Sequence, residues 1–198
     1  MRVGVDFDNT IVCYHEVFHQ LAREQGLIPA DFPQNKEKIR DYLRSVGQEN
    51  LWTEMQGYVY GERMSAASPF PGVAAFFKTA LEEDIPLCII SHKTRHPYAG
   101  PPYDLHQAGL AWLEQYDFFG LERKNTFFLE TKQAKCVKVA EQHCTHFIDD
   151  LPELLLDPHF PTQVEKLLFS PEKVVHVQLK NFQSWQEIQQ YLFGSTSS

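Results

Sequence analysis

The sequence is short of positive charge: 18 Lys and Arg residues stand against 26 Asp and Glu residues, and the formal net charge is −8 at pH 7. A protein that binds duplex nucleic acid or an anionic membrane through bulk charge needs a basic surface. We therefore expect no nucleic-acid-binding surface and no membrane partner. Any phosphate group that this protein handles must be neutralised locally, by a metal ion or by a few basic side chains.

Cysteine is also scarce, and the four cysteines form neither a CxxC pair nor a cysteine–histidine spacing typical of zinc sites. Isolated thiols of this kind are typical of a reduced, cytoplasmic protein. Long apolar runs are missing too, since no stretch approaches the ~18 residues of a membrane span. The opening residues, MRVGVDFD, lead directly into an expected strand rather than a signal peptide. We expect a soluble, cytoplasmic protein.

The rest of the composition is ordinary, with 43% hydrophobic and 22% charged residues, as in a globular protein with one good core. Short apolar runs alternate with amphipathic stretches, which predicts parallel βαβ units and a doubly wound, Rossmann-like α/β sheet. The expected strands begin at residue 3 and then cover 87–91, 126–130, 145–149, 166–170 and 174–179. The expected helices cover 14–26, 73–84, 104–116, 132–143 and 184–193.

One polar stretch interrupts this alternation. Between residues 31 and 68 the apolar residues come in short groups, which indicates short helices rather than strands. We therefore expect a core made of residues 1–13 and 71–198, with a small helical insert over 14–70. The segment SHKTRHPYAGPPYDLHQ, residues 91–107, is too long for a tight connection, and long loops at a ligand-binding edge are usually functional.

The stretch VGVDFDNTIV places Asp6 and Asp8 at the end of the first apolar strand. Two carboxylates at i and i+2 share one face of an extended chain, where they repel each other unless a cation or a proton lies between them. A polar turn capped by Asn9 and Thr10 is the simpler interpretation. It accounts for one Asp more readily than for two.

Further polar residues follow other expected strands. Ser91 ends one strand, Asp149 and Asp150 end another, and Lys132 and Lys135 open the helix after the strand at 126–130. The carboxyl ends of parallel strands share one edge of the sheet, where ligands bind. Clustered carboxylates there select Mg²⁺, and a carboxylate can attack phosphorus while a hydroxyl and an ammonium hold the phosphoryl oxygens.

These motifs resemble those of phosphatases of the haloacid dehalogenase (HAD) superfamily. DFDNT at 6–10 matches the DxDx[TV] signature, and Ser91, a lysine and the acidic pair at 149–150 follow in the family's order. The resemblance implies that Asp6 is the nucleophile and a Mg²⁺ ligand, and that Asp8 is the general acid/base, with its carbonyl as a ligand.

The resemblance also implies that Ser91 binds the phosphoryl group, and that Asp149 and Asp150 complete the metal shell. The family's lysine is assigned to Lys135, with Lys132 as its rival. The remaining substrate contacts are assigned to Asn9, Thr10, His92 and Lys93. The resemblance further implies that the insert after the first strand is a helical cap.

Receiver domains and dehalogenases are two alternatives to a phosphatase. Receiver domains of response regulators use similar residues, but their acidic pair follows the first strand and their lysine comes last. Asp8 argues against a dehalogenase, whose chemistry at carbon lacks this acid/base. We expect a Mg²⁺-dependent phosphomonoester hydrolase that acts through an aspartyl-phosphate on a small phosphorylated metabolite. A phosphotransferase and a catalytically quiet binding domain stay open as alternatives, and the sequence predicts neither the substrate nor the oligomeric state.

Overall fold

The computed structural model describes residues 1–116, 121–172 and 175–194, and the chain forms two compact units. The sheet unit comprises residues 1–12, 69–93 and 117–198, and the helical unit comprises residues 13–68 and 94–116. Within the described ranges, every helix is too short or too polar to cross a lipid bilayer.

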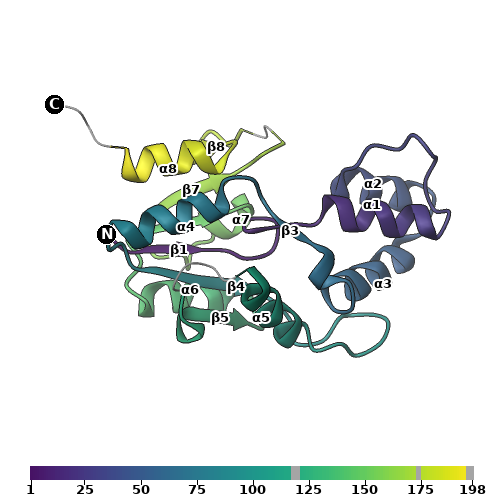
Figure 1. The fold of residues 1–198 in the computed structure, drawn as a ribbon, viewed down its shortest axis with the longest axis horizontal. Coiled ribbons are helices and arrows are strands. Elements are labelled where there is room, and N and C mark those ends of the chain that lie inside the picture. Colours follow the sequence, from purple (N-terminus) through teal and green to yellow (C-terminus); the bar gives the residue numbers. More distant parts are fainter. Residues whose placement is uncertain (117–120, 173–174, 195–198) are drawn as a thin grey trace. The chain divides into compact units, whose positions relative to one another are not determined.

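A parallel sheet of six strands forms the centre of the sheet unit, in the spatial order β5-β4-β1-β6-β7-β8 (Figure 1). These are runs rich in Val, Ile, Leu and Phe, as expected for strands covered on both faces. The predicted doubly wound α/β fold is therefore confirmed. The strands are β1 (Val3–Val5), β4 (Leu87–His92), β5 (Thr126–Leu129), β6 (His146–Asp149), β7 (Glu165–Phe169) and β8 (Lys180–Phe182).

Helices cover both faces of this sheet (Figure 1). On one face lie α4 (Val73–Glu82) and α8 (Trp185–Phe193), where the rings of Phe76 and Trp185 pack with centroids 4.9 Å apart. On the other face lie α6 (Lys132–Glu141) and α7 (Pro152–Leu155), and a short 3-10 helix, η2 (Arg123–Asn125), precedes β5. The α6 and α7 face is closed by one apolar cluster that includes Ile90, Cys136, Val139, Phe147, Leu154 and Leu168.

The last strand lies later in the chain than its apolar pattern predicts. The prediction of a strand over 174–179 is wrong: residues 175–179 form no strand, and residue 174 lies outside the described residues. The strand is β8, which pairs with β7 from Lys180 onward. Asn181 explains the shift, because its side chain hydrogen-bonds to backbone groups of His176 and Leu179 and holds them in a turn.

The helical unit contains α1 (His15–Glu24), α2 (Lys36–Ser45), α3 (Glu49–Tyr60), the 3-10 helix η1 (Met64–Ala66) and α5 (Leu105–Tyr116). The short strands β2 (Val12–Cys13) and β3 (Ser68–Pro69) pair where the chain passes from one unit to the other. Short helices, as expected between residues 31 and 68, therefore make up most of this unit.

Helix α5 groups with the helical unit and not with the sheet, which differs from the predicted division into 14–70 and the rest. Trp112 of α5 is the reason: its indole is buried, and its Nε1 donates a hydrogen bond to the carbonyl of Ala67 over 2.7 Å. Tyr116 donates to the same carbonyl over 3.0 Å. Both partners lie in the helical unit, so residues 94–116 add a second segment to the predicted insert.

Gly4, in the middle of β1, permits close packing beneath the sheet. A Cβ atom at this position would lie 2.6 Å from Cδ2 of Phe147 and 2.9 Å from Sγ of Cys144, closer than real Cβ contacts allow. The absence of a side chain at Gly4 thus lets β1 lie against the buried ring that packs under α6.

We predict that Gly4→Ala lowers the free energy of unfolding by about 1–3 kcal/mol, because the added methyl group overpacks the core. Urea denaturation measures this change. Combining Gly4→Ala with Phe147→Leu, which makes room, should cost less than the sum of the two single changes. Wild-type stability in Gly4→Ala would contradict the close approach.

Candidate active site

The candidate site lies at the carboxyl edge of the sheet, where β1 and β6 are neighbours. The chain proceeds from β1 to β4 and β5 on one side, and later from β6 to β7 and β8 on the other. Such a reversal of strand order is where doubly wound sheets bind ligands. Asp6 follows β1, and its backbone N–H donates to the carbonyl of Ile148 over 2.9 Å, which places it beside Asp149.

A buried lysine joins these two acids. Nζ of Lys135 lies 2.5 Å from Oδ1 of Asp6 and 2.6 Å from Oδ2 of Asp149, and its side chain is 2% exposed. The side chain of Thr131 caps the start of α6 by accepting from the amide of Ala134, which fixes the turn that carries Lys135. Lys132 instead pairs with Glu153 near the surface, so only Lys135 of the two rivals reaches the acids.

Burial and neighbouring charges have opposite effects on the pKa values of Asp149 and Lys135. Burial raises the pKa of Asp149, and repulsion from Asp6 adds to this, so that the pKa reaches about 7 although Lys135 lowers it. Burial alone would lower the pKa of Lys135, but the neighbouring charges of Asp149 and Asp6 hold that pKa above its ordinary value. The lysine therefore stays charged.

The acids at this edge fit a divalent cation. Asp6, Asp149 and Asp150 each offer a carboxylate oxygen, and these atoms lie within 4.8 Å of one another. Oxygen donors of this kind suit Mg²⁺. The hydroxyl of Thr10 lies 3.2 Å from Oδ2 of Asp6 and 3.3 Å from Oδ1 of Asp150, so it links the two strand ends. The carbonyl of Thr10 in turn accepts from Nε1 of Trp185 over 3.1 Å.

Asp8 is held by a different lysine. Nζ of Lys93 lies 3.0 Å from both carboxylate oxygens of Asp8, and the side chains are 2% and 18% exposed, respectively. The sequence pattern assigned Lys93 to the substrate and missed this pair, since 85 residues separate the partners. Only the strand order, which sets β4 beside β1, provides a signal for it.

Ser91 places a hydroxyl at the end of β4. The residue is 1% exposed, and its Oγ has no hydrogen-bond partner among the residues that the structure describes. A buried hydroxyl without a partner costs about 1–3 kcal/mol. Such a donor is suited to a ligand oxygen.

Two further predicted residues lie near the site without joining the acidic cluster. Burial lowers the pKa of His92, and a backbone hydrogen bond with Glu130 partly offsets this effect. Asn9 has a φ of 61° and donates its N–H to the carbonyl of Val12 over 3.0 Å, so it forms the turn after Asp8. This is the turn that the residue pattern of the loop predicted for Asn9.

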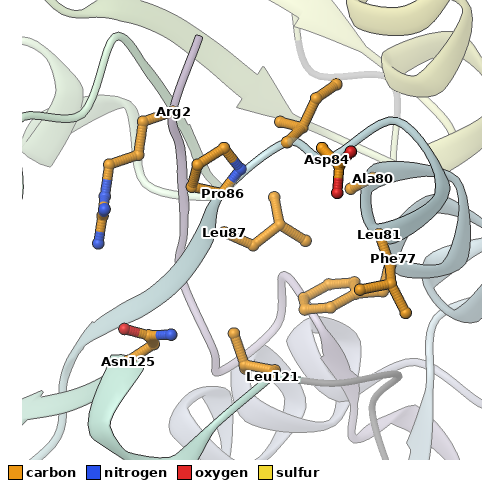
Figure 2. A pocket seen from close by; sticks show the side chains of 10 residues that line it. Arg2, Phe77, Ala80, Leu81, Asp84, Pro86, Leu87, Leu121 and Asn125 are labelled. Carbon is orange, nitrogen blue, oxygen red and sulfur yellow. The ribbon is translucent and has the colours of Figure 1, made fainter.

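A pocket lies at the other edge of the sheet (Figure 2). It has a volume of about 250 Å³, and Pro86 and Leu87, at the amino end of β4, form part of its wall with Phe77. None of the predicted site residues lines it. The pocket is therefore separate from the acidic edge, where β4 ends with Ser91 and His92.

Comparisons with known proteins identify the fold. No family model matches the sequence, and no curated protein matches it. Solved structures do match. One is a dehalogenase, with a TM-score of 0.60 and 10% sequence identity over 96% of both chains. Another is a HAD family hydrolase from Deinococcus radiodurans with bound phosphate and sodium, with a TM-score of 0.58 and 12% identity over 96% of this chain and 94% of that one. A HAD hydrolase from Bacillus subtilis bound to magnesium also matches, with a TM-score of 0.54 and 10% identity over 97% of this chain and 98% of that one. The chain thus has the fold of HAD-superfamily hydrolases.

We predict that Lys135→Met lowers the free energy of unfolding by about 3–5 kcal/mol at neutral pH, because it leaves Asp6 and Asp149 buried together without a counter-charge. Lys132→Met, one turn earlier on the same helix, is the matched control and should change stability by no more than about 0.5 kcal/mol. Chemical denaturation without metal compares the two. Equal losses would show that the buried pair contributes nothing specific.

Proposed function

We propose that this protein is a Mg²⁺-dependent phosphatase that hydrolyses a small phosphorylated metabolite through an aspartyl-phosphate intermediate. One observation carries the proposal: three carboxylates cluster at the strand edge, two of them paired with a buried lysine, and a fourth acid, Asp8, follows two residues after Asp6 in a separate ion pair. The arrangement provides a nucleophile, a cation site and an independent group for proton transfer.

In the first step, an oxygen of Asp6 attacks the phosphorus of the substrate. The new Asp6–phosphorus bond forms as the bond from phosphorus to the leaving oxygen breaks, and Asp8 gives its proton to that oxygen. Lys135 fixes the carboxylate of Asp6 for this attack. The unpartnered hydroxyl of Ser91 donates to a phosphoryl oxygen.

In the second step, water replaces the protein at phosphorus. Asp8, now a carboxylate, accepts a proton from the attacking water, and the Asp6–phosphorus bond breaks to release inorganic phosphate. Asp6 returns to its carboxylate form and Asp8 to its acid form, so the cycle consumes one water and one phosphomonoester.

Asp6, Asp149 and Asp150 would hold the Mg²⁺. When bound, the cation neutralises the negative charge shared by the carboxylates and the phosphoryl group. This arrangement agrees with the neighbours in fold, one of which is bound to magnesium and another to phosphate.

Asp8 separates this function from dehalogenation, although one structural neighbour is a dehalogenase. Halide leaves carbon without a proton, so a dehalogenase needs neither an acid beside the nucleophile nor a cation site. Here, a buried lysine is dedicated to the acid that follows the nucleophile. This favours an oxygen leaving group that must be protonated, as in a phosphomonoester.

We predict that the protein releases phosphate from at least one member of a panel of phosphorylated sugars, nucleotides and small acids in the presence of Mg²⁺. Asp6→Asn should abolish this activity, and Asp8→Asn should reduce it about 10²–10⁴-fold, the usual contribution of a general acid or base. Borohydride reduction of the quenched wild type should convert Asp6 to homoserine, the product expected of an acyl phosphate. Wild type and Asp6→Asn with the same phosphate release would exclude the proposed reaction.

We predict that Mg²⁺ raises the melting temperature of the wild type by roughly 5–10 °C at a concentration of 100 times the dissociation constant, since binding then adds ~2.7 kcal/mol. Asp149→Asn should lose most of this shift, because it removes a ligand. Asp157→Asn changes an acid that pairs with His159 at the surface and should keep the full shift. The same response in both variants would place the metal elsewhere.

A further inference from the structure

We propose that Lys93 is a positioning residue, which holds the carboxylate of Asp8 in the orientation needed for proton transfer. This inference rests on the proposed phosphatase function. It assigns Lys93 a role distinct from the substrate contact that the sequence pattern indicates.

The ammonium of Lys93 contacts both carboxylate oxygens of Asp8. Nζ of Lys93 lies at the same distance, 3.0 Å, from each carboxylate oxygen, so rotation of the carboxylate in either direction lengthens one of the two hydrogen bonds. A carboxylate has about four lone-pair sites. The two hydrogen bonds from Lys93 use two of these sites, and the side chain of Asp8 is 18% exposed.

Lys93 is itself fixed at both ends. Its backbone N–H donates to the carbonyl of Leu129 over 2.8 Å, which continues the β4–β5 ladder past the end of β4. Its Nζ lies 5.5 Å from the ring centroid of Phe7, a fully buried residue whose ring packs 5.2 Å from that of Phe128. A lysine side chain ordinarily samples many rotamers, and this one is restricted by strand, ring and carboxylate together.

Fixing Asp8 matters because it lies beyond the end of β1, in an isolated bridge with Val12 next to a turn. β1 ends at Val5, and Asn9 adopts the left-handed conformation directly after Asp8. Proton transfer requires the acid within hydrogen-bond reach of the leaving oxygen, and a displacement of about 1 Å can cost 10²-fold in rate. Lys93, directly after β4, holds the side chain of Asp8 from the neighbouring strand.

Different lysines pair with the two acids of the DxD motif. Lys135 joins Asp6 to Asp149, whereas Lys93 contacts Asp8, so each acid of the DxD motif has its own ammonium. Removing Lys93 should therefore impair proton transfer while leaving the nucleophile and the cation site intact. A lysine that contacts the phosphoryl group directly would impair every substrate alike.

The test compares two leaving groups in Lys93→Met, which keeps the apolar stem of the side chain. An alkyl phosphate needs a proton on its leaving oxygen, whereas para-nitrophenyl phosphate releases a stable phenolate without one. We expect kcat/KM to fall about 10²-fold or more for the alkyl phosphate, with its KM nearly unchanged, and less than about 10-fold for the aryl phosphate.

Pre-steady-state kinetics provide a second measurement. Hydrolysis of the aspartyl-phosphate still requires Asp8 as a base, so Lys93→Met should give a burst of para-nitrophenolate equal to the active-site concentration. The double variant Asp8→Asn/Lys93→Met should be no slower than Asp8→Asn alone, because Lys93 acts only through Asp8. Lys78→Met, on the exposed face of α4, should keep wild-type kinetics for both substrates.

Three results would overturn the inference: equal losses for both substrates with a raised KM, no loss for either, or a further loss in the double variant. If Lys93→Met does not fold, Lys93→Gln, which keeps a donor without the charge, carries the same comparison. A wild type that releases phosphate from neither substrate nor from the wider panel would overturn the phosphatase proposal itself. Activity in the wild type with an unselective loss in the variant would overturn only the role of Lys93.

Discussion

The ion pair of Lys135 with Asp6 and Asp149 is the interaction on which the rest of the site depends. Parallel strands bring two acids together at neighbouring strand ends, and burial would make them repel each other strongly. One ammonium between them allows both to stay at the edge of the core. The placement of α6 follows from this, because its first turn must deliver Lys135 while its apolar side packs on Phe147 and Ile90.

A second lysine gives the two acids of the DxD motif different surroundings. Asp6 and Asp8 are only two residues apart, yet one is buried in the cluster at the β1–β6 junction and the other is held from β4. The two acids therefore experience different surroundings, which is the physical condition for one to act as a nucleophile and the other to transfer protons. The cost of burying two lysines argues that these orientations serve function more than stability.

The sequence predicted this edge because its local rules agree with the fold: apolar strands that end in Asp6, Ser91 and Asp149 leave little choice about where those residues meet. The sequence did not predict three features of the structure. The Lys93–Asp8 pair depends on which strands are neighbours. Helix α5 groups with the helical unit because Trp112 is buried there, which its helical pattern does not predict. The side chain of Asn181 holds in a turn the β-branched run before β8, which favours a strand. The first two depend on contacts between residues far apart in the chain, whereas the third is a local side-chain hydrogen bond that prevailed over strand propensity.

The candidate site, like the whole chain, has more acidic than basic side chains, and this limits how it can bind a phosphate. Lys135 balances only one of the three clustered carboxylates, so the edge stays negative and repels a phosphate dianion. Lys93 is paired with Asp8, so part of its positive charge is already balanced. The unpartnered hydroxyl of Ser91 adds a donor but no charge. A divalent cation held by the same carboxylates would remove the repulsion, which is why we expect the acidic cluster and the phosphatase function to depend on Mg²⁺ together.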